Sequence, residues 1–306
     1  MSILLDCKTP VVVQGITGKE GSYWTRHMRD LGTNVVAGVT PGKGGMEQDG
    51  VPVCGCVEEA VKRHGAEASM VFVPPKFTRD AVMEALDAGI RLIVTIADGI
   101  PLHEMAEIRS RAKENGAMVI GGNTSGVISP GMAMMGCFPY WIDRVYKKGR
   151  IGIMTRSGSL TNEVTSMVVA AGYGVSTLTG VGGDPVPGTR FAELLPLYEA
   201  DSGTDAVVII GELGGTMEEE AAELKRQGIF TKPLVAFLGG RTAPPGVKMG
   251  HAGAIATGGK GSVKDKIEAL ESAGALVADR PSRGGALLRR ALGERKRRRP
   301  KRDDGV

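Results

Sequence analysis

Short apolar runs alternate with amphipathic segments along most of the chain. In the first part, the runs are rich in Val, Ile and Met, and the segments between them have helical apolar spacing. The strands are expected over Val11–Gln14, Asn34–Val39, Met70–Val73, Leu92–Ile96 and Met118–Ile120. The helices are expected over Tyr23–Leu31, Val57–Arg63, Thr78–Ala88 and Leu102–Asn115. Because the apolar runs are continuous, both strand faces are predicted to be covered, as in a parallel sheet with crossover helices.

A second series of the same kind starts after residue 150. Its strands are expected over Ile151–Thr155, Val175–Leu178, Ala206–Gly211, Pro233–Leu238 and Ala275–Val277. Its helices are expected over Leu160–Ala171, Phe191–Tyr198, Met217–Gln227 and Val263–Ala273. Thr216 and Glu219 have the spacing of a capping box, and Gly228 is a stop signal for the same helix.

These two series predict an α/β protein of two doubly wound domains. We expect a Rossmann-like domain over 1–128, a connecting segment over 129–150 and a flavodoxin-like domain over 151–288. Residues 289–306 form a tail that we expect to be disordered. Residues 289–302 hold nine Lys or Arg and one Glu, and the last four residues hold two Asp. Since the whole chain has a net charge of +4, residues 1–288 carry −2, and the positive charge belongs to the tail.

Composition narrows the class of protein. Glycine accounts for 46 of 306 residues, and the glycines follow short apolar runs, as in α/β domains whose loops approach a ligand closely. Aromatic residues make up only 4%, which argues against a nucleic-acid stacking surface. No apolar run is long enough to span a membrane, and four dispersed cysteines do not form a disulfide scaffold. We therefore expect a cytoplasmic protein without membrane contact.

The first candidate site is the segment Gly15-Ile-Thr-Gly-Lys-Glu-Gly21, which follows the first strand and opens a helix. Glycines at this place let backbone amides face a phosphate at the positive helix end. The second strand is followed by Lys43 instead of the acidic residue that holds ribose hydroxyls in a dinucleotide site. A cation there suits a phosphorylated ribose, as in coenzyme A or NADP. The alternative is a tight turn without a ligand.

The second candidate site is Thr155-Arg-Ser-Gly-Ser-Leu-Thr161, where a strand again leads into a helix. Small residues and hydroxyls at a helix N-terminus favour phosphate or carboxylate. The segment does not match the elbow of a serine nucleophile. The alternative is an ordinary N-cap.

The third candidate site is His251, which lies between Gly250 and the pair Ala252–Gly253. Such small neighbours leave a ring nitrogen open to a phosphoryl group, and imidazole is a competent nucleophile near neutral pH. Glu212, in a glycine-rich loop after a strand, is the candidate partner for the ring. No histidine or cysteine lies at zinc-ligand spacing, so no metal site is expected. The alternative for His251 is an ordinary loop residue.

Taken together and in this order, the three segments resemble the alpha subunit of succinyl-CoA synthetase. The likeness extends to about residue 290 and includes GVTPGKGG at 38–45, VPP at 73–75, GVGGDPVPG at 180–188, GELGG at 211–215 and GHAGAI at 250–255. The resemblance implies an NTP-dependent carboxylate–CoA ligase that is built from two different subunits, of which this chain is one. A beta subunit with an ATP-grasp fold would bind ATP or GTP with Mg²⁺ and much of the small carboxylate substrate.

The resemblance also implies a role for each matching residue. His251 would be phosphorylated and would pass the phosphoryl group to the carboxylate, with Glu212 as its hydrogen-bond partner. Coenzyme A would be held by Thr17, Gly18, Lys19, Glu20, Lys43, Pro74, Ile96, Ala97 and Asp98. The phosphoryl group and substrate would meet Ser157, Gly158, Ser159, Asn162, Asn123 and Thr124.

Two segments depart from the succinate enzymes. This chain has Gly121-Gly-Asn-Thr-Ser-Gly126 where the family has two prolines, and it has Asn162 where the succinate enzymes have a tyrosine. Asparagine at that position is more similar to the citrate-activating relatives. The same chemistry on malate or citrate is therefore an alternative substrate assignment, and a CoA- or NADP-binding module without catalysis is an alternative function.

Overall fold

The first sheet is built from the N-terminal part of the chain. The computed structural model describes residues 2–243, 250–255 and 261–293. The strands of this sheet are β1 (Val11–Gln14), β2 (Val35–Val39), β3 (Glu47–Gln48), β4 (Val51–Cys54), β5 (Ala68–Val71), β6 (Leu92–Thr95) and β7 (Met118–Ile120). Their order is β3-β4-β2-β1-β5-β6-β7. Apart from β3, which pairs antiparallel with β4, this is the strand order of the Rossmann fold.

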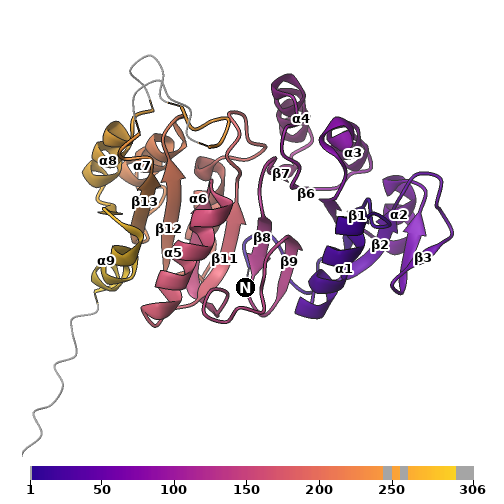
Figure 1. The fold of residues 1–306 in the computed structure, drawn as a ribbon, viewed down its shortest axis with the longest axis horizontal. Helices are drawn as coiled ribbons and strands as arrows, with labels where there is room; N and C mark the ends of the chain where they lie inside the picture. The colour runs from indigo at the N-terminus through magenta and orange to yellow at the C-terminus, as the bar shows by residue number, and fades with distance from the viewer. Residues whose placement is uncertain (1, 244–249, 256–260, 294–306) are drawn as a thin grey trace, which may run out of the picture.

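Four helices cross over between these strands and cover both faces of the sheet (Figure 1). They are α1 (Lys19–Leu31), α2 (Val57–His64), α3 (Pro75–Asp87) and α4 (Leu102–Glu114). The strands β1, β5 and β6 are buried at every position, as their continuous apolar runs predict. The helix α1 ends where Gly32 adopts a φ of 118°, and the backbone N–H groups after the turn close the last carbonyls.

The second sheet contains the other strands. They are β8 (Gly126–Ser129), β9 (Ala133–Gly136), β10 (Lys148–Thr155), β11 (Val175–Gly180), β12 (Ala206–Glu212), β13 (Leu234–Gly239) and β14 (Leu276–Ala278). The order is β14-β13-β12-β10-β11-β8-β9. The parallel strands β10 to β14 have the flavodoxin-like order. The helices around them are α5 (Gly158–Ala170), α6 (Phe191–Ala200), α7 (Met217–Arg226), α8 (Val263–Ser272), the short 3-10 helix Pro281–Arg283 and α9 (Gly284–Ala291).

The predicted fold class is thus confirmed, but the change from one sheet to the other lies earlier than expected. The segment 129–150 is expected to connect the two domains, whereas β9 and the first residues of β10, which belong to the second sheet, lie within it. The hairpin β8–β9 joins the second sheet through β8, which pairs antiparallel with β11. The chain therefore crosses between the sheets at residues 121–125.

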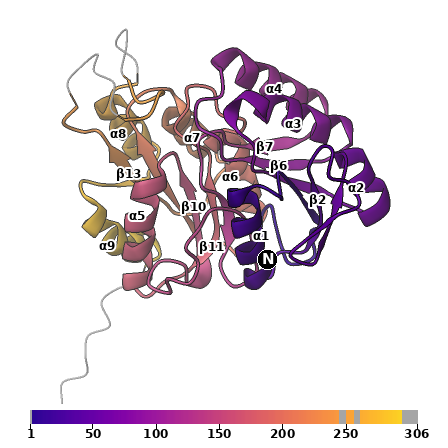
Figure 2. The same cartoon turned by 45° about the vertical axis from the view of Figure 1, so that its right-hand side comes forward.

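The two halves of the chain lie side by side (Figure 2), and α1 of the first half contacts β9 of this hairpin. The hydroxyl of Thr33, just after α1, donates to the carbonyl of Met134 in β9 at 2.8 Å and accepts from the N–H of Met134 at 2.9 Å. A Cβ at Gly32 would lie 2.7 Å from the carbonyl oxygen of Met132. The absence of a side chain at Gly32 thus allows the end of α1 to pack directly on the hairpin.

One local prediction at a helix end is wrong, and another is contradicted at its first residues only. Thr216 makes no side-chain cap at α7, because its hydroxyl donates to the carboxylate of Glu220 instead. The predicted tail at 289–306 begins with three residues that belong to α9. Residues 294–306 lie outside the described residues. The stop at Gly228 is as predicted: α7 ends at Arg226, Gln227 is its C-cap, and Gly228 follows with φ at 72°. In the part of the chain that is described, no helix has the length and apolarity needed to cross a bilayer.

Candidate active site

The candidate residues of the second sheet lie at the carboxyl ends of its parallel strands. In the second sheet, β11 lies beside β10 on one side and β12 lies beside β10 on the other, so the direction of the strand order reverses at β10. Ligands of open α/β sheets bind at such a switch point, beyond the carboxyl ends of the strands. Arg156 follows β10 directly, and Glu212 is the last residue of β12. The segment with His251 lies over this end of the sheet.

His251 and Glu212 form a close pair. Nδ1 of the imidazole lies 2.9 Å from Oε2 and 3.0 Å from Oε1 of the carboxylate. The Glu212 side chain is 8% exposed and the His251 side chain 28% exposed. Within the described residues no hydrogen bond engages Nε2 of His251. The pair thus fixes one ring nitrogen and leaves the other available.

Glycine residues surround the imidazole closely. A Cβ at Gly183 would lie 2.3 Å from Cγ and 2.4 Å from Nδ1 of His251, so only glycine fits there. The carbonyl of Gly183 accepts the N–H of Gly253 at 3.0 Å, which holds the histidine segment to the loop after β11. The small residues at 252–253 therefore allow backbone contact beside the ring, in addition to leaving it open.

The environment of His251 favours its charged form. The hydrogen bond with Glu212 raises the pKa of the imidazole above its ordinary value of 6.5. Burial lowers the pKa, the charge of Glu212 raises it further, Arg156 lowers it and Asp184 raises it. The net direction is upward. The carboxylate therefore stabilises positive charge on the ring, as required when an electrophile bonds to Nε2.

A chain of buried charges continues behind Glu212. Arg156 contacts Glu212 Oε1 at 3.5 Å through Nη2 and Glu218 Oε1 at 3.2 Å through Nη1. Lys266, in the first turn of α8, forms an ion pair with the other oxygen of Glu218 and lies 2.9 Å from Glu219 Oε2. The side chains of Arg156, Glu218 and Lys266 are at most 1% exposed. We call these three residues the buried charge network. Sequence reasoning did not single them out.

The start of α5 presents backbone donors and hydroxyls. Ser157 is the N-cap, and its hydroxyl accepts the N–H of Leu160 at 3.4 Å. Gly158 and Ser159 follow and are exposed. Asn162 is also exposed, and its Oδ1 accepts a hydrogen bond from the hydroxyl of the buried Tyr146. The first turn of the helix is therefore open to a ligand, and its positive end suits an anion.

The loop between the sheets connects the two halves of the site. Asn123 donates its backbone N–H to the carbonyl of Ala97 at 2.8 Å and its side-chain amide to Asp184 Oδ1 at 3.2 Å. Thr124 donates its hydroxyl to the carbonyl of Gly180 at 2.7 Å. Burial raises the pKa of Asp184, and its neighbour Asp98 raises it too. Asn123 therefore brings the segment after β6 next to the loop beside His251.

Asp184 is a site residue that sequence reasoning missed. It is 7% exposed, and its charge acts on the pKa of His251. The signal in the sequence is an acidic residue between Gly183 and Pro185 in the loop after a strand, where a routine surface ion pair is poorly placed.

A separate pocket lies at the switch point of the first sheet, where β2 lies on one side of β1 and β5 lies on the other. Its volume is about 410 Å³. The lining includes the ends of these three strands and one face of α3: Gln14, Gly15, Val39, Thr40, Pro41, Val73, Pro74, Phe77, Asp80, Ala81 and Glu84. Most of the exposed lining is apolar, which suits a planar ring system of a cofactor-sized ligand.

The predicted coenzyme A residues are divided between two places. Pro74 lines the pocket, and Thr17 contacts it by donating its hydroxyl to that of Thr40 at 3.2 Å. Lys43 is exposed and donates to the Thr17 hydroxyl at 3.1 Å. Gly18, Lys19 and Glu20 lie exposed at the start of α1. Ile96, Ala97 and Asp98 do not line the pocket. They follow β6, and the charge of Asp98 acts on Asp184.

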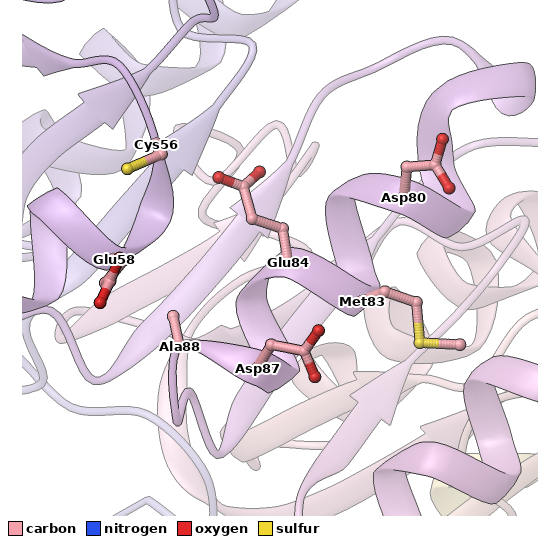
Figure 3. A pocket seen from close by; sticks show the side chains of 7 residues that line it. All are labelled: Cys56, Glu58, Asp80, Met83, Glu84, Asp87 and Ala88. Carbon is pink, nitrogen blue, oxygen red and sulfur yellow. The ribbon is translucent and has the colours of Figure 1, made fainter.

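A second hollow, of about 550 Å³, lies between α2 and α3 (Figure 3). Its lining includes four carboxylates, those of Glu58, Asp80, Glu84 and Asp87. Three of them already pair with cations on the surface, namely Lys62, Arg79 and Arg111. Asp80 and Glu84 also line the apolar pocket, so the carboxylates do not separate the two sites. The apolar pocket is the better candidate for a phosphorylated cofactor because it combines a mostly apolar lining with Lys43 close by.

Comparison with known proteins identifies the family. The chain matches the CoA binding domain family over residues 6–99 and the CoA-ligase family over residues 154–276. It is 72% identical to the ADP-forming sulfoacetate-CoA ligase subunit SqwL of an Acholeplasma species, over 94% of this chain and 97% of that one. The chain belongs to the family of ADP-forming CoA ligase alpha-type subunits. The ligase subunit is also 68% identical to the sulfoacetate-CoA ligase subunit SauD of Bilophila wadsworthia, over 96% of this chain and all of that one.

Two further relatives bear on the substrate. The alpha subunit of the ADP-forming succinate–CoA ligase of Aquifex aeolicus is 49% identical, over 95% of both chains. The solved ATP citrate lyase of Methanosaeta concilii superposes with a TM-score of 0.86 at 25% identity, and the ligase subunit spans about half of that chain. The family suggested by the sequence motifs is therefore confirmed. The comparison does not favour succinate over sulfoacetate as the substrate, because the two sulfoacetate-CoA ligase subunits are more similar to this chain than the succinate–CoA ligase subunit is.

Proposed function

We propose that this chain is the coenzyme A-binding, phosphohistidine-carrying subunit of an ADP-forming sulfoacetate–CoA ligase. The pair of His251 and Glu212 is the observation that carries the proposal. It combines a carboxylate on Nδ1, an Nε2 free of hydrogen bonds from the described residues, and an environment that raises the pKa of the ring. The substrate is taken from the relatives that share 72% and 68% identity with the chain.

In the first step, the lone pair of Nε2 attacks the γ-phosphorus of ATP, and the bond from that phosphorus to the ADP oxygen breaks. The N–P bond forms, and the proton on Nδ1 stays on the ring, where the Glu212 carboxylate compensates the positive charge. We propose that the nucleotide and Mg²⁺ are held by a partner subunit with an ATP-grasp fold. Glu212 thus lowers the barrier by preorganised charge instead of by proton transfer.

In the second step, a carboxylate oxygen of the substrate takes the phosphoryl group and releases the imidazole. The thiol of coenzyme A then attacks the acyl carbon, the thioester forms, and phosphate leaves with the thiol proton. An oxide is too poor a leaving group for direct attack by a thiol, and the phosphoryl relay replaces it by phosphate. The start of α5, with Ser157, Gly158 and Ser159, supplies amides and hydroxyls for the phosphoryl oxygens.

Sulfoacetate carries a tetrahedral sulfonate beside its reactive carboxylate. A sulfonate stays ionised at any pH where the enzyme works and accepts hydrogen bonds without donating them. Asn162 fits this chemistry, because Tyr146 donates to its Oδ1 and so leaves the amide N–H groups as donors. The further donors that we assign to the phosphoryl group and the substrate are the Ser159 hydroxyl and the second amide hydrogen of Asn123, whose first is donated to Asp184. The Thr124 hydroxyl already donates to the Gly180 carbonyl and holds the loop in place.

The apolar pocket at the ends of β1, β2 and β5 fits the proposed coenzyme A. Pro74 and Phe77 offer apolar surface to an adenine ring, and Lys43 offers a cation to a phosphorylated ribose. When bound, coenzyme A supplies the thiol that takes the acyl group. The segment Ile96, Ala97 and Asp98 leads from this domain toward the reacting centre, next to Asp184.

The test is a carboxylate panel on the complex of this chain with its partner subunit. Sulfoacetate, succinate, malate, citrate and itaconate are each offered with ATP and coenzyme A, and ADP and thioester are measured. We expect the highest kcat/KM for sulfoacetate. A higher value for any other acid would overturn the substrate assignment.

The phosphohistidine step is tested separately with γ-labelled ATP. The wild-type complex should gain an acid-labile, alkali-stable label, and His251→Asn should gain none while still binding coenzyme A. His103→Asn, at an exposed position in α4, is the matched control and should label like the wild type. Binding of coenzyme A without any label on the wild-type complex would contradict the catalytic role and favour a binding module.

A further inference from the structure

The buried charge network behind Glu212 does more than connect neighbouring elements of the fold. Arg156, Glu218 and Lys266 come from three different elements: the loop after β10, the first turn of α7 and the first turn of α8. Removing charges from water is costly, and a buried group that loses its partner is left uncompensated. A chain that keeps three such charges directly behind its reactive histidine therefore invites a functional explanation.

Arg156 is shared between two carboxylates. Its Nη1 lies 3.2 Å from Glu218 Oε1 and donates to the carbonyl of Gly214 at 2.7 Å, whereas its Nη2 lies 3.5 Å from Glu212 Oε1. The guanidinium is therefore bound more closely to Glu218 than to Glu212. The same Oε1 of Glu212 lies 3.0 Å from Nδ1 of His251. The guanidinium and the imidazole thus compete for one carboxylate oxygen.

Glu218 is built into this position. Its Oε1 also accepts the backbone N–H of Glu212 at 3.1 Å. A Cβ at Gly211 would lie 2.4 Å from that oxygen, so the glycine before Glu212 makes room for the carboxylate. Burial opposes the charged form, but Arg156 and Lys266 together hold the pKa of Glu218 below its usual range. Glu218 is therefore a fixed negative charge under the loop that carries Glu212.

We propose that Glu218 is a positioning residue: it compensates the charge of Arg156, so that the carboxylate of Glu212 stays on the imidazole of His251. This inference rests on the proposed function for its catalytic consequence. Lys266 completes the arrangement by holding the second oxygen of Glu218 and the carbonyl of Gly215, at 3.0 Å. Without the charge of Glu218, Arg156 binds Glu212 more strongly and draws it from the ring.

The charged groups that face His251 define the direction in which its titration midpoint is expected to move. They are Glu212 from β12, Arg156 from the loop after β10 and Asp184 from the loop after β11. Loss of the Glu212 contact removes the main stabilisation of the protonated ring, while Arg156 continues to oppose it. The titration midpoint of His251 must then move to lower pH.

The experiment compares Glu218→Gln with Glu219→Gln in the full chain bound to its partner subunit. Glu219 also contacts Lys266 but is 27% exposed, which makes it the matched control for loss of one carboxylate from the cluster. The titration of His251 is followed by NMR on histidine labelled at Cε1, and phosphorylation by γ-labelled ATP is followed against pH. Glu218→Gln should lower the midpoint by about one pH unit, the scale of one nearby opposite charge. It should also slow phosphorylation at least tenfold.

The controls separate positioning from a merely structural role. Glu219→Gln should keep the wild-type midpoint and rate, and Glu218→Asp, which retains the charge, should restore most of both. If Glu218→Gln does not fold, the double variant Glu218→Gln/Lys266→Met, which removes a compensated pair, takes its place and should lower the midpoint in the same way. A folded Glu218→Gln or double variant with the wild-type midpoint would overturn the proposal, as would an equal shift in Glu219→Gln.

The NMR titration needs neither nucleotide nor carboxylate. If the wild-type complex incorporates no label, the proposed function fails, while the midpoint still decides whether Glu218 controls the contact of Glu212 with His251. The two failures are thus distinguishable.

Discussion

Gly183 offers the sharpest test of the geometry at His251. Replacing it by alanine places a Cβ 2.3 Å from Cγ and 2.4 Å from Nδ1 of the imidazole, whereas ordinary contacts begin at 3.4 Å. The ring must therefore move by about 1 Å, and a displacement of this size can cost about 100-fold in rate. Because the backbone of Gly183 is outside the left-handed region, the substitution adds no backbone strain.

Nδ1, one of the two ring atoms that clash, is also the atom that contacts Glu212, so relieving the clash displaces this contact. We therefore expect Gly183→Ala to slow phosphorylation of His251 by about 100-fold, which corresponds to about 2.7 kcal/mol of lost transition-state stabilisation. Folding and coenzyme A binding should change little, because the His251 side chain is 28% exposed and its shift leaves no buried cavity.

The assay is the single-turnover rate of labelling from γ-labelled ATP in the complex with the partner subunit. Gly284→Ala is the matched control, because a Cβ there meets no atom within 4 Å and the backbone is helical with φ at −53°. It should label at the wild-type rate. A folded Gly183→Ala protein that also labels at the wild-type rate would refute the argument that the glycine defines the position of the imidazole.

Two further predictions concern the cofactor pocket and pH. Lys43→Ala should weaken binding of coenzyme A far more than binding of dephospho-coenzyme A, measured by calorimetry, because the ammonium group is assigned to the 3′-phosphate; equal losses for both ligands would reject that role. The raised pKa of His251 makes its pair with Glu212 a source of stability that is fully present below pH 6.5 and is lost as the pH rises through the folded-state pKa. The melting temperature of the wild type should therefore exceed that of Glu212→Gln by more at pH 6 than at pH 9, and a constant difference would contradict the charged pair.

The amino-acid pattern by itself determined the elements and much of the site. Continuous apolar runs mark strands covered on both sides, and the glycine-rich turns after them mark the carboxyl ends where ligands bind. Because parallel strands end at one edge of a sheet, Glu212 and the segment Thr155–Thr161 could be assigned to the same edge without coordinates. The small neighbours of His251 likewise indicated an open ring.

Only the tertiary structure decided which residues far apart in the sequence come into contact. The hairpin β8–β9 escaped prediction, since its pairing with β11 joins residues about 50 positions apart, and a short apolar run does not specify its partner. Asp184 meets Asn123, and Glu218 meets Arg156 and Lys266, only because the loops of separate strands converge. A glutamate in the first turn of a helix is an ordinary feature of sequence. Its burial between two cations is set by the packing of three elements, and packing is non-local.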